Sequence, residues 1–496
     1  MPDRISQSGL WKIQRDYYRH LGMAAWDDKT PYYVTNSQVI SESYADLITA
    51  FLLDHPPDLG QPLYILEMGS GTGRFGYQLA RELTRKFQYF QSLRPLQFTV
   101  ILSDIVEDNV KFWEQHPRLA DLGPRIDFAL IEPGFEDRVW LRRSRQKLAD
   151  LSNPLVVVAN YIFDSIPHDE FRVHNGQVEE CLIEIVAKAH CPNSSPERLD
   201  ARDVEIVRSY RPIHAATYYD AARHREVLLH YQKSIAQGSV TVPVAALDCL
   251  DRLRQLGKLL LISSDRGFTS AEAMAVYPDH PLALHEGCFS HMVNYHALGL
   301  SFPGALSTQR HLLDGVQTVC FSDLPAGPQL SYAFGERIDR KNTINNANDL
   351  FCILRDKPPF RGLLGFVKLH LHDPNAFSAV AKKLSENLAG LCYGDHQEVV
   401  STLEQVWEHD FYFRGSPNLT FWLAHLYACL GLFERALSFY DLTIERQGVD
   451  EMLLYLQGSC WQAMGNAEQA RHLYQQALQR VPDMPEAMQA LRSLST

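Results

Sequence analysis

Several signals typical of other protein classes are missing from this 496-residue sequence. It has no run of about 18 apolar residues, which argues against a membrane-spanning helix. The first twenty residues lack the apolar core of a secretory signal, so we expect no export. The nine cysteines include no C-x-x-C pair. This argues against a zinc cage or a disulfide framework and favours free thiols in a reducing compartment. We therefore expect a cytoplasmic protein.

An excess of basic charge is missing as well. The 47 lysines and arginines are outnumbered by 59 acidic residues, giving a net charge of −12, which argues against a nucleic-acid-binding protein. The serine nucleophile motif G-x-S-x-G does not occur. His285, His291 and His296 cluster in the chain without a recognisable ligand spacing, so we predict no metal site.

What is present is a series of short apolar runs that alternate with helical segments. The strands are expected at 63–66, 98–102, 125–131, 154–160 and 258–265. This order predicts a parallel, Rossmann-like α/β sheet, which binds ligands at the carboxyl ends of its strands. The polar residues at or near those ends are Glu67, Asp104, Asp127, Asn160 and Asp265.

The chain divides into parts of different character. We predict a helical segment over 1–60, the α/β domain over 61–375 and a helical domain over 376–496, with 346–375 either a last strand or a bridge. An insertion at about 170–257 opens with a hairpin at Asn175-Gly176, because a type I′ turn needs two residues with positive φ. In the helical domain, glycine, alanine and tyrosine residues recur at a spacing of 34 residues, which resembles the tetratricopeptide repeat. Repeats of this kind predict docking of a protein partner. The recurring pairs are Gly431 with Gly465, Ala436 with Ala470 and Tyr440 with Tyr474.

The stretch LEMGSGTGRFG (66–76) fits two cofactors. Its G-x-G-x-x-G matches a dinucleotide-binding loop, and its acidic-x-G-x-G-x-G matches a methyltransferase loop. Glu67 favours the second interpretation, because a carboxylate beside the loop repels a pyrophosphate but suits the amino group, sulfonium and ribose of S-adenosylmethionine. We predict that Glu67, Gly69, Gly71 and Gly73 bind this donor.

Further donor contacts are expected at the ends of the other strands. Asp104 suits hydrogen bonds to the ribose hydroxyls. Asp127 and Phe128 on the third strand are candidates for contact with the adenine. Asn160, at the end of the fourth strand, is a candidate for contact with the donor's amino group.

Four separated blocks of the sequence resemble one known family. These are YYVTNSQVISESYADLI (32–48), NYIFDSIPHDEF (160–171), LLLISSDRG (259–267) and HEGCFSHMVNYHAL (285–298). Together they are similar to MidA-type methyltransferases, the bacterial relatives of the mitochondrial arginine methyltransferase that assists complex I assembly. The resemblance spans about 30 to 300, and it implies S-adenosylmethionine as cofactor and a protein arginine as acceptor.

The resemblance also implies the acceptor residues. A guanidinium keeps its proton, so carboxylates must hold and orient it. Asp164 is the candidate for this role, beside Asn160. Tyr161 stands where the family usually has glutamate, and Arg266 replaces a family tyrosine. These departures keep two alternatives open: an assembly factor that binds the donor without transfer, and a small-molecule methyltransferase.

Overall fold

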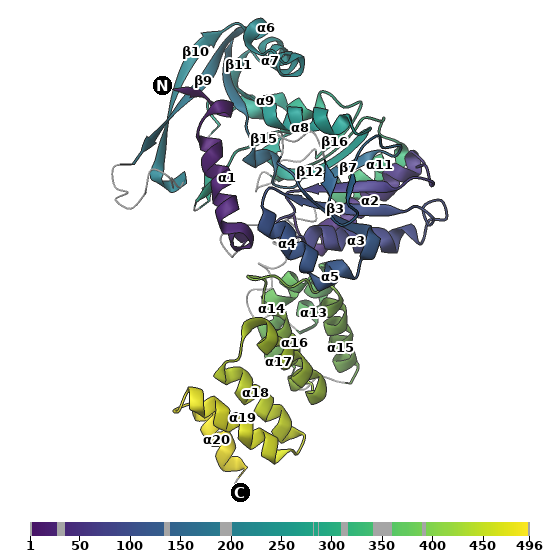
Figure 1. Cartoon of the computed structure of the whole chain (residues 1–496), viewed down its shortest axis with the longest axis vertical. Helices are drawn as coiled ribbons and strands as arrows, with labels where there is room; N and C mark the ends of the chain where they lie inside the picture. Colours follow the sequence, from purple (N-terminus) through teal and green to yellow (C-terminus); the bar gives the residue numbers. More distant parts are fainter. Residues whose placement is uncertain are drawn as a thin grey trace. The chain divides into compact units, whose positions relative to one another are not determined.

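The computed structural model describes residues 2–26, 35–132, 139–188, 201–280, 282–285, 287–308, 316–340, 360–388 and 393–494. These form two compact units (Figure 1). The first comprises residues 1–36 and 40–346, and the second comprises 37–39 and 347–496. The expected boundary at 375 falls within the second unit. Each unit is described by itself.

The main sheet of the first unit has the strand order β16-β17-β12-β7-β2-β3-β4. Its strands are β2 (Leu63–Met68), β3 (Phe98–Asp104), β4 (Ile126–Leu130), β7 (Leu155–Val158), β12 (Leu259–Phe268), β16 (Gly304–Ser307) and β17 (Val316–Ser322). The five expected strands are all confirmed, and they run parallel to one another. The antiparallel strand β17 and its partner β16 complete the sheet beyond β12 and were not predicted. The short β15 (Val293–Asn294) pairs with the end of β12.

Helices cover both faces of this sheet because its strands are buried on both sides. Leu66, Val157 and Leu261 pack with Leu247 of α8 in one apolar cluster. The helices of the main-sheet region are α2 (Gln38–Asp54), α3 (Arg74–Phe87), α4 (Glu107–Gln115), α5 (Pro117–Ala120), α8 (Val244–Arg254), α9 (Ala271–Ala275), α10 (Tyr295–Gly299) and α11 (Pro328–Phe334).

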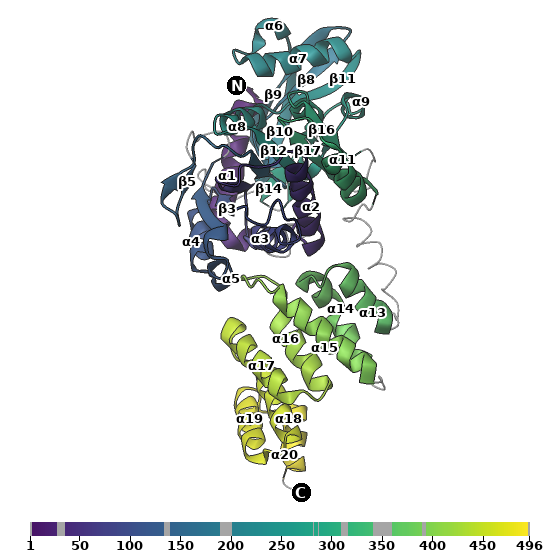
Figure 2. The ribbon, with the colours of Figure 1, turned by 90° about the vertical axis from the view of Figure 1, so that its right-hand side faces the viewer.

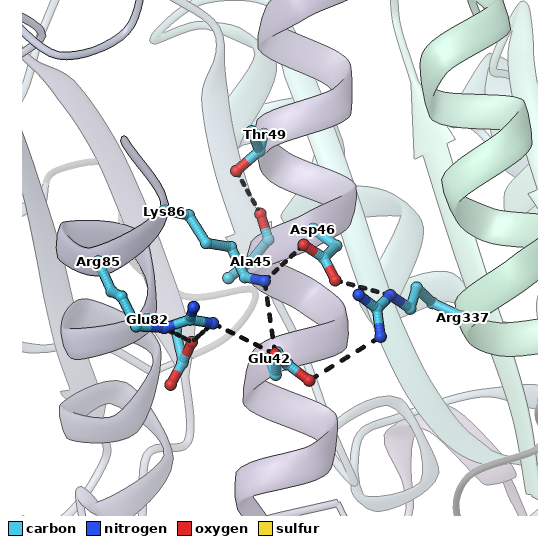
Figure 3. A network of polar contacts seen from close by, with 8 residues as sticks. All are labelled: Glu42, Ala45, Asp46, Thr49, Glu82, Arg85, Lys86 and Arg337. Atoms are coloured by element: carbon cyan, nitrogen blue, oxygen red, sulfur yellow. Dashed lines mark hydrogen bonds and ion pairs between the residues drawn. The ribbon is translucent and has the colours of Figure 1, made fainter. Parts of the chain in front are cut away.

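Ion pairs join α2 to its neighbours (Figure 3). Lys86 of α3 lies 2.6 Å from Asp46 of α2, and Arg337, in a π-helical turn at Gly335–Arg340, lies 2.7 Å from the same carboxylate. Glu42, one turn earlier on α2, meets Arg85 at 3.2 Å. Lys86 is only 9% exposed, so this network is better shielded from water than an ordinary surface pair. It fixes α2 beside α3, next to the glycine loop.

The expected insertion builds a second, antiparallel sheet. It contains β1 (Asp3–Arg4), β8 (Asp169–His174), β9 (Gln177–Ala187), β10 (Val204–Ile213) and β11 (Gln237–Val242), and carries α6 (Ala215–Tyr218) and α7 (Ala222–Ser234). Asn175 and Gly176, with φ of 47° and 79°, turn β8 into β9, which confirms the predicted hairpin. Near the start of the chain, α1 (Leu10–Leu21) packs against β14 (Cys288–Ser290), which pairs with β13 (Ala283–His285).

The second unit is entirely helical in its described residues (Figure 2). Its helices are α13 (Phe360–Leu369), α14 (Pro374–Glu386), α15 (Tyr393–Glu408), α16 (Leu419–Cys429), α17 (Phe433–Gln447), α18 (Glu451–Ala463), α19 (Ala467–Arg480) and α20 (Pro485–Ser493). The segment left open as a last strand is therefore the helix α13 from Phe360 onward, because Leu363, Leu364 and Val367 recur at helical spacing and are buried. Residues 341–359 lie outside the described residues.

Two consecutive helix pairs of this unit share one local geometry. Gly431, between α16 and α17, has φ of 75°, and Gly465, between α18 and α19, has φ of 84°. The residue after each glycine donates its backbone N–H over 2.9 Å to a carbonyl, that of Tyr427 or that of Trp461. Ala436 and Ala470 are both fully buried. The 34-residue period is thus a structural period.

Candidate active site

A pocket lies at the switch point of the main sheet. β2 and β7 are neighbours, and the chain continues from β2 to one side and from β7 to the other, so a crevice opens beyond their carboxyl ends. The pocket encloses about 1220 Å³, including its open mouth, which is enough for a nucleoside joined to an amino acid. Its lining includes residues 67–72, Asp104, Ile105, Asn160 and Tyr161.

The glycine loop follows β2 and reaches the pocket with its backbone. Gly69, Gly71 and Gly73 all have positive φ, between 50° and 79°. A Cβ on Gly69 would lie 2.1 Å from the Ile162 side chain, and one on Gly73 would lie 2.8 Å from Trp113. These positions therefore need glycine for both conformation and space. Gly69 and Gly71 line the pocket, whereas Gly73 lies behind them at the start of α3.

The amide groups of this loop are already used within the protein. Ser70 N–H donates to Ser103, Gly73 N–H donates to Ser70, and Gly71 N–H donates to the Asp104 carboxylate over 3.2 Å. Arg74 N–H, at the first position of α3, donates to the Thr72 hydroxyl. A pyrophosphate binds to free amides at a helix N-terminus. With these four amides engaged, the loop suits a ligand without phosphate.

Glu67 is the most unusual acidic group of the pocket. Its Oε2 is buried and has no hydrogen-bond partner among the described residues. Burial raises the pKa of Glu67 to about 8, and the nearby Asp104 carboxylate adds to this rise. Oε2 lies 2.5 Å from where a Cβ of Gly76 would stand, so the last glycine of the G-x-G-x-x-G makes room for Glu67. A ligand that donates a hydrogen bond would satisfy this orphaned oxygen.

Asp104 lines the pocket at the end of β3, as predicted. Its Oδ1 accepts from Val106 N–H over 3.0 Å, and its Oδ2 accepts from Gly71 N–H and from the Asn109 amide over 3.1 Å. Burial raises its pKa to about 6. A carboxylate has about four acceptor positions, so Asp104 keeps capacity for a ribose hydroxyl while it holds the glycine loop.

Asp127 and Phe128 do not reach the pocket lining. The Asp127 carboxylate accepts hydrogen bonds from the backbone of Phe128, Arg143 and Ser144, and so fixes the turn between β5 (Trp140–Leu141) and β6 (Gln146–Lys147). Phe128 is buried against Trp113. The pocket residues beyond β4 are instead Ile131 and Glu132, because the strand continues past Phe128 before it meets the crevice.

Asn160 and Tyr161 both line the pocket beyond β7. The Asn160 Oδ1 accepts from the Tyr44 hydroxyl over 2.8 Å and from Ser264 N–H over 2.9 Å, and its Nδ2 donates to the Thr35 carbonyl over 3.4 Å. Tyr161 has φ of 51°, a left-handed conformation that is strained for a bulky residue and is concentrated at functional sites.

Asp164 lies behind the pocket rather than in its lining. It is 5% exposed, and its Oδ1 accepts from the Ser165 hydroxyl, which does line the pocket, over 2.7 Å. Its backbone N–H donates to Asp265 Oδ2 over 3.2 Å. Burial raises the pKa of Asp164 to about 6, while burial and the Asp164 charge raise the pKa of the fully buried Asp265 much further. The expected acceptor carboxylate is therefore one of a buried pair.

One wall of the pocket was missed from the sequence. Trp11, Gln14, Arg15 and Tyr18 of α1 line it. Arg15 and Arg19 both contact Glu132, at 3.4 and 2.9 Å, and thereby connect α1 to the loop after β4. The four lining residues stand at i, i+3, i+4 and i+7, the spacing of one helical face, and this mixed aromatic and polar face was the available signal.

The loop, the acidic strand ends and the switch-point crevice are those of the Rossmann-like class of nucleoside-binding proteins. Residues 47–262 match the family model described as "Putative S-adenosyl-L-methionine-dependent methyltransferase". The matched segment contains the glycine loop, Asp104, Asn160 and Asp164. The chain is an S-adenosylmethionine-dependent methyltransferase, and S-adenosylmethionine is its cofactor.

Two solved structures are similar to part of the chain. One is an uncharacterized protein from Burkholderia thailandensis, which is 14% identical in sequence and has a TM-score of 0.39. The alignment covers 66% of this chain and 89% of that chain. The other, from the same organism, is described as a likely methyl transferase bound to S-adenosyl-homocysteine, and it is 15% identical with a TM-score of 0.38. That alignment covers 62% of this chain and 81% of that chain. No curated protein matches the chain.

The residues present fit this cofactor. The orphaned Glu67 Oε2 and the spare acceptor positions of Asp104 suit its hydroxyl and ammonium donors, and Gly69 and Gly71 allow close approach. Bound there, the cofactor supplies a methyl group on a positively charged sulfur.

Within the described residues no group of three His, Cys, Asp or Glu side chains is placed to hold a metal ion, and no helix is long and apolar enough to cross a bilayer.

Proposed function

We propose that this chain methylates a protein side-chain nitrogen, that arginine is the first acceptor to test, and that its helical unit docks the partner that carries it. The observation that carries this proposal is the joining of a methyl-donor pocket to two helix pairs with one repeated turn geometry. The repeat and the four family-like blocks support a MidA-type enzyme with tetratricopeptide-type repeats. We place its activity in the cytoplasm, and the six free cysteines of the described residues support a reducing environment.

The docking surface that we propose for the helical unit lies on α16. On α16, Phe421 and Trp422 are half-buried, with ring centres 5.3 Å apart, and His425 stacks on Phe421 at 6.0 Å. Half-buried aromatic groups of this kind provide large contact areas at protein interfaces. Stacked helix pairs present such residues along a continuous surface.

The acceptor chemistry is tested by transfer of radiolabelled methyl groups to proteins of a cell lysate. We expect labelled protein, with methylarginine after hydrolysis, and loss of label with Asp164→Asn. Label on another residue type would overturn arginine as the acceptor. Label only on small molecules would indicate a small-molecule methyltransferase. Donor binding without any labelled product would indicate an assembly factor, the function that Tyr161 in place of a family glutamate favours.

Docking is tested in the same assay with a variant of the aromatic surface. We expect Trp422→Ala to reduce labelling while donor affinity stays unchanged. His472→Ala, an exposed position on α19, is the control and should label as the wild type does. Equal labelling by all three proteins would contradict the docking role.

A further inference from the structure

We propose that Ser165, Asp164 and Asp265 form a proton relay that accepts the proton lost by the methyl acceptor. This inference rests on the proposed function, since it requires an acceptor that carries an N–H or O–H group. Asp265 has no role in the site as described so far, and Ser165 was not among the predicted residues.

The chemistry requires such a relay. When the lone pair of an acceptor nitrogen attacks the methyl carbon, an N–C bond forms, the carbon–sulfur bond breaks and its electron pair stays on sulfur. The methylated nitrogen then holds one proton too many, and a positioned base that removes it assists the transfer. A buried carboxylate near the pocket can accept this proton.

The geometry provides a path from the pocket to a carboxylate. Ser165 is half-buried in the lining, and its hydroxyl donates over 2.7 Å to Asp164 Oδ1. The Asp164 carboxylate is not part of the lining, so Ser165 connects it to the pocket. The acceptor's proton passes to Ser165 Oγ while the Ser165 hydroxyl proton passes to Asp164. The serine is regenerated, and Asp164 ends as a neutral acid.

Asp265 makes this neutral state favourable. β7 and β12 are paired, with Val158 opposite Ile262, so the residues that follow them stand side by side. Asp265 has zero exposure, its Oδ2 accepts from the Asp164 backbone N–H over 3.2 Å, and the Asp164 charge raises its pKa, so the two carboxyls are close neighbours. Two buried carboxyls in contact cannot both ionise, so one proton is shared in the resting protein. A second proton then removes the last buried charge of the pair.

The other ionisable groups around Asp164 and Asp265 do not change their protonation near neutral pH, so the carboxyl pair is the group that titrates there. Arg266 on β12 provides a positive charge that lowers the pKa of Asp164. His291, after β14, donates its backbone N–H to the Asp164 carbonyl, and burial lowers the pKa of its ring to about 4. The tyrosines that face the pair from α1, α2 and α10 have pKa values raised by burial, so they stay neutral. They are Tyr18, Tyr44 and Tyr295.

The shared proton is tested directly by infrared difference titration of the protein without substrate. The variants are compared in a Glu67→Gln background, because Glu67, with a pKa of about 8, is itself protonated at pH 7. There we expect a protonated-carboxyl band at pH 7 that disappears in Asp265→Asn, and a second protonation near pH 6 that Asp164→Asn reduces to the share of Asp104. Asp127→Asn, which removes a buried carboxylate outside the pocket, is the control and should keep both. In the Glu67→Gln background, the absence of a protonated-carboxyl band at pH 7, or a band that Asp265→Asn leaves unchanged, would overturn the relay.

The transfer of the proton is tested in the labelling assay at saturating donor. We expect Ser165→Ala to lower the rate roughly 100-fold with donor affinity unchanged, and Ser165→Thr, which keeps a hydroxyl, to recover much of it. The wild-type rate should rise with pH through about 6, as Asp164 ionises. A wild type that labels no protein would overturn the proposed function. If the wild type labels protein and Ser165→Ala has the same rate and pH profile, the relay is overturned but the proposed function is not.

Discussion

At the scale of single residues, the site is built from carboxyl groups that burial keeps hard to ionise. Glu67 and Asp104 stand at strand ends and Asp164 in the turn after β7, and burial raises the pKa of all three. A raised pKa lowers the stability of the folded protein at neutral pH, since the unfolded chain ionises these groups more readily. These carboxyl groups therefore reduce the stability of the folded protein, as expected for residues that serve function.

Glu67→Gln should change how stability depends on pH in the absence of donor. The folded pKa is about 8 against an ordinary value of 4.5, so the stabilisation is full below about 4.5 and is lost as pH rises towards 8. Relative to the variant, the wild type should lose on the order of 4 kcal/mol across this range. Urea unfolding at pH 4.5, 6 and 8 measures the difference. A constant difference at all three values would contradict the burial of an ionisable Glu67.

Tyr44→Phe should weaken donor binding while the fold is retained. The Tyr44 hydroxyl lies 2.8 Å from Asn160 Oδ1 and 2.6 Å from Ser264 Oγ, so its loss removes one of the hydrogen bonds that hold the Asn160 amide. We expect a loss of roughly 1 kcal/mol in stability and a clear rise in the donor dissociation constant. Tyr440→Phe is the matched control, because that buried hydroxyl has no partner among the described residues. If both variants bind the donor equally well, Tyr44 does not position Asn160.

At the scale of elements, the sequence predicted the strands well and the walls of the site poorly. The runs ending at Glu67, Asp104 and Asn160 are continuous and apolar, which is the pattern of strands buried on both faces, and all five were found. The strands β16 and β17 beyond β12 were missed, and so was the place of the helix α1 in the pocket wall. They depend on pairing and packing between distant parts of the chain, and the local pattern of apolar residues does not report such contacts.

The same limit explains the outcome for the candidate site. Glu67, Asp104, Asn160 and Tyr161 line the pocket because their positions follow directly from strand order. Asp127 stands at the amino end of β4 and Asp164 in the turn after β7, and their side chains serve a turn and a carboxyl pair. Which way a side chain points after a strand depends on the loop conformation, and the pattern of residues does not determine that.

Gly76→Ala should be more damaging to unit 1 than its regular helical backbone suggests. An added Cβ would lie 2.0 Å from Leu102 Cδ2 and 2.5 Å from Glu67 Oε2, so α3 would have to move away from β3. We expect a loss of roughly 1–3 kcal/mol, together with weaker donor binding. Gly365→Ala, in the helix α13 with open space around it, is the control and should be neutral or stabilising. Equal stability of the two variants would contradict the close packing at Gly76.

At the scale of the whole molecule, the chain joins a donor-binding unit to a helical unit with its own core. The second unit has a separate apolar cluster that runs from α13 to α18. Stability of stacked helix pairs depends on each pair and its neighbours, so damage to one turn should stay within that unit.

Gly431→Ala and Gly465→Ala test this separation. Both glycines have positive φ and no atom within 4 Å of an added Cβ, so only the backbone conformation opposes alanine. We expect each variant to lose about 1 kcal/mol of stability in the helical unit, with donor affinity unchanged. Thermal unfolding together with calorimetric donor titration separates the two effects. A fall in donor affinity in either variant would contradict independent units.

The central claim is that the pocket holds S-adenosylmethionine rather than a dinucleotide. Isothermal titration calorimetry of the full chain with S-adenosylmethionine and with NAD tests this claim most directly. We predict saturable binding of S-adenosylmethionine at one site, weakened at least tenfold by Glu67→Ala, on the order of 1.4 kcal/mol, and no detectable binding of NAD. Binding of NAD, with no heat from S-adenosylmethionine, would contradict the account.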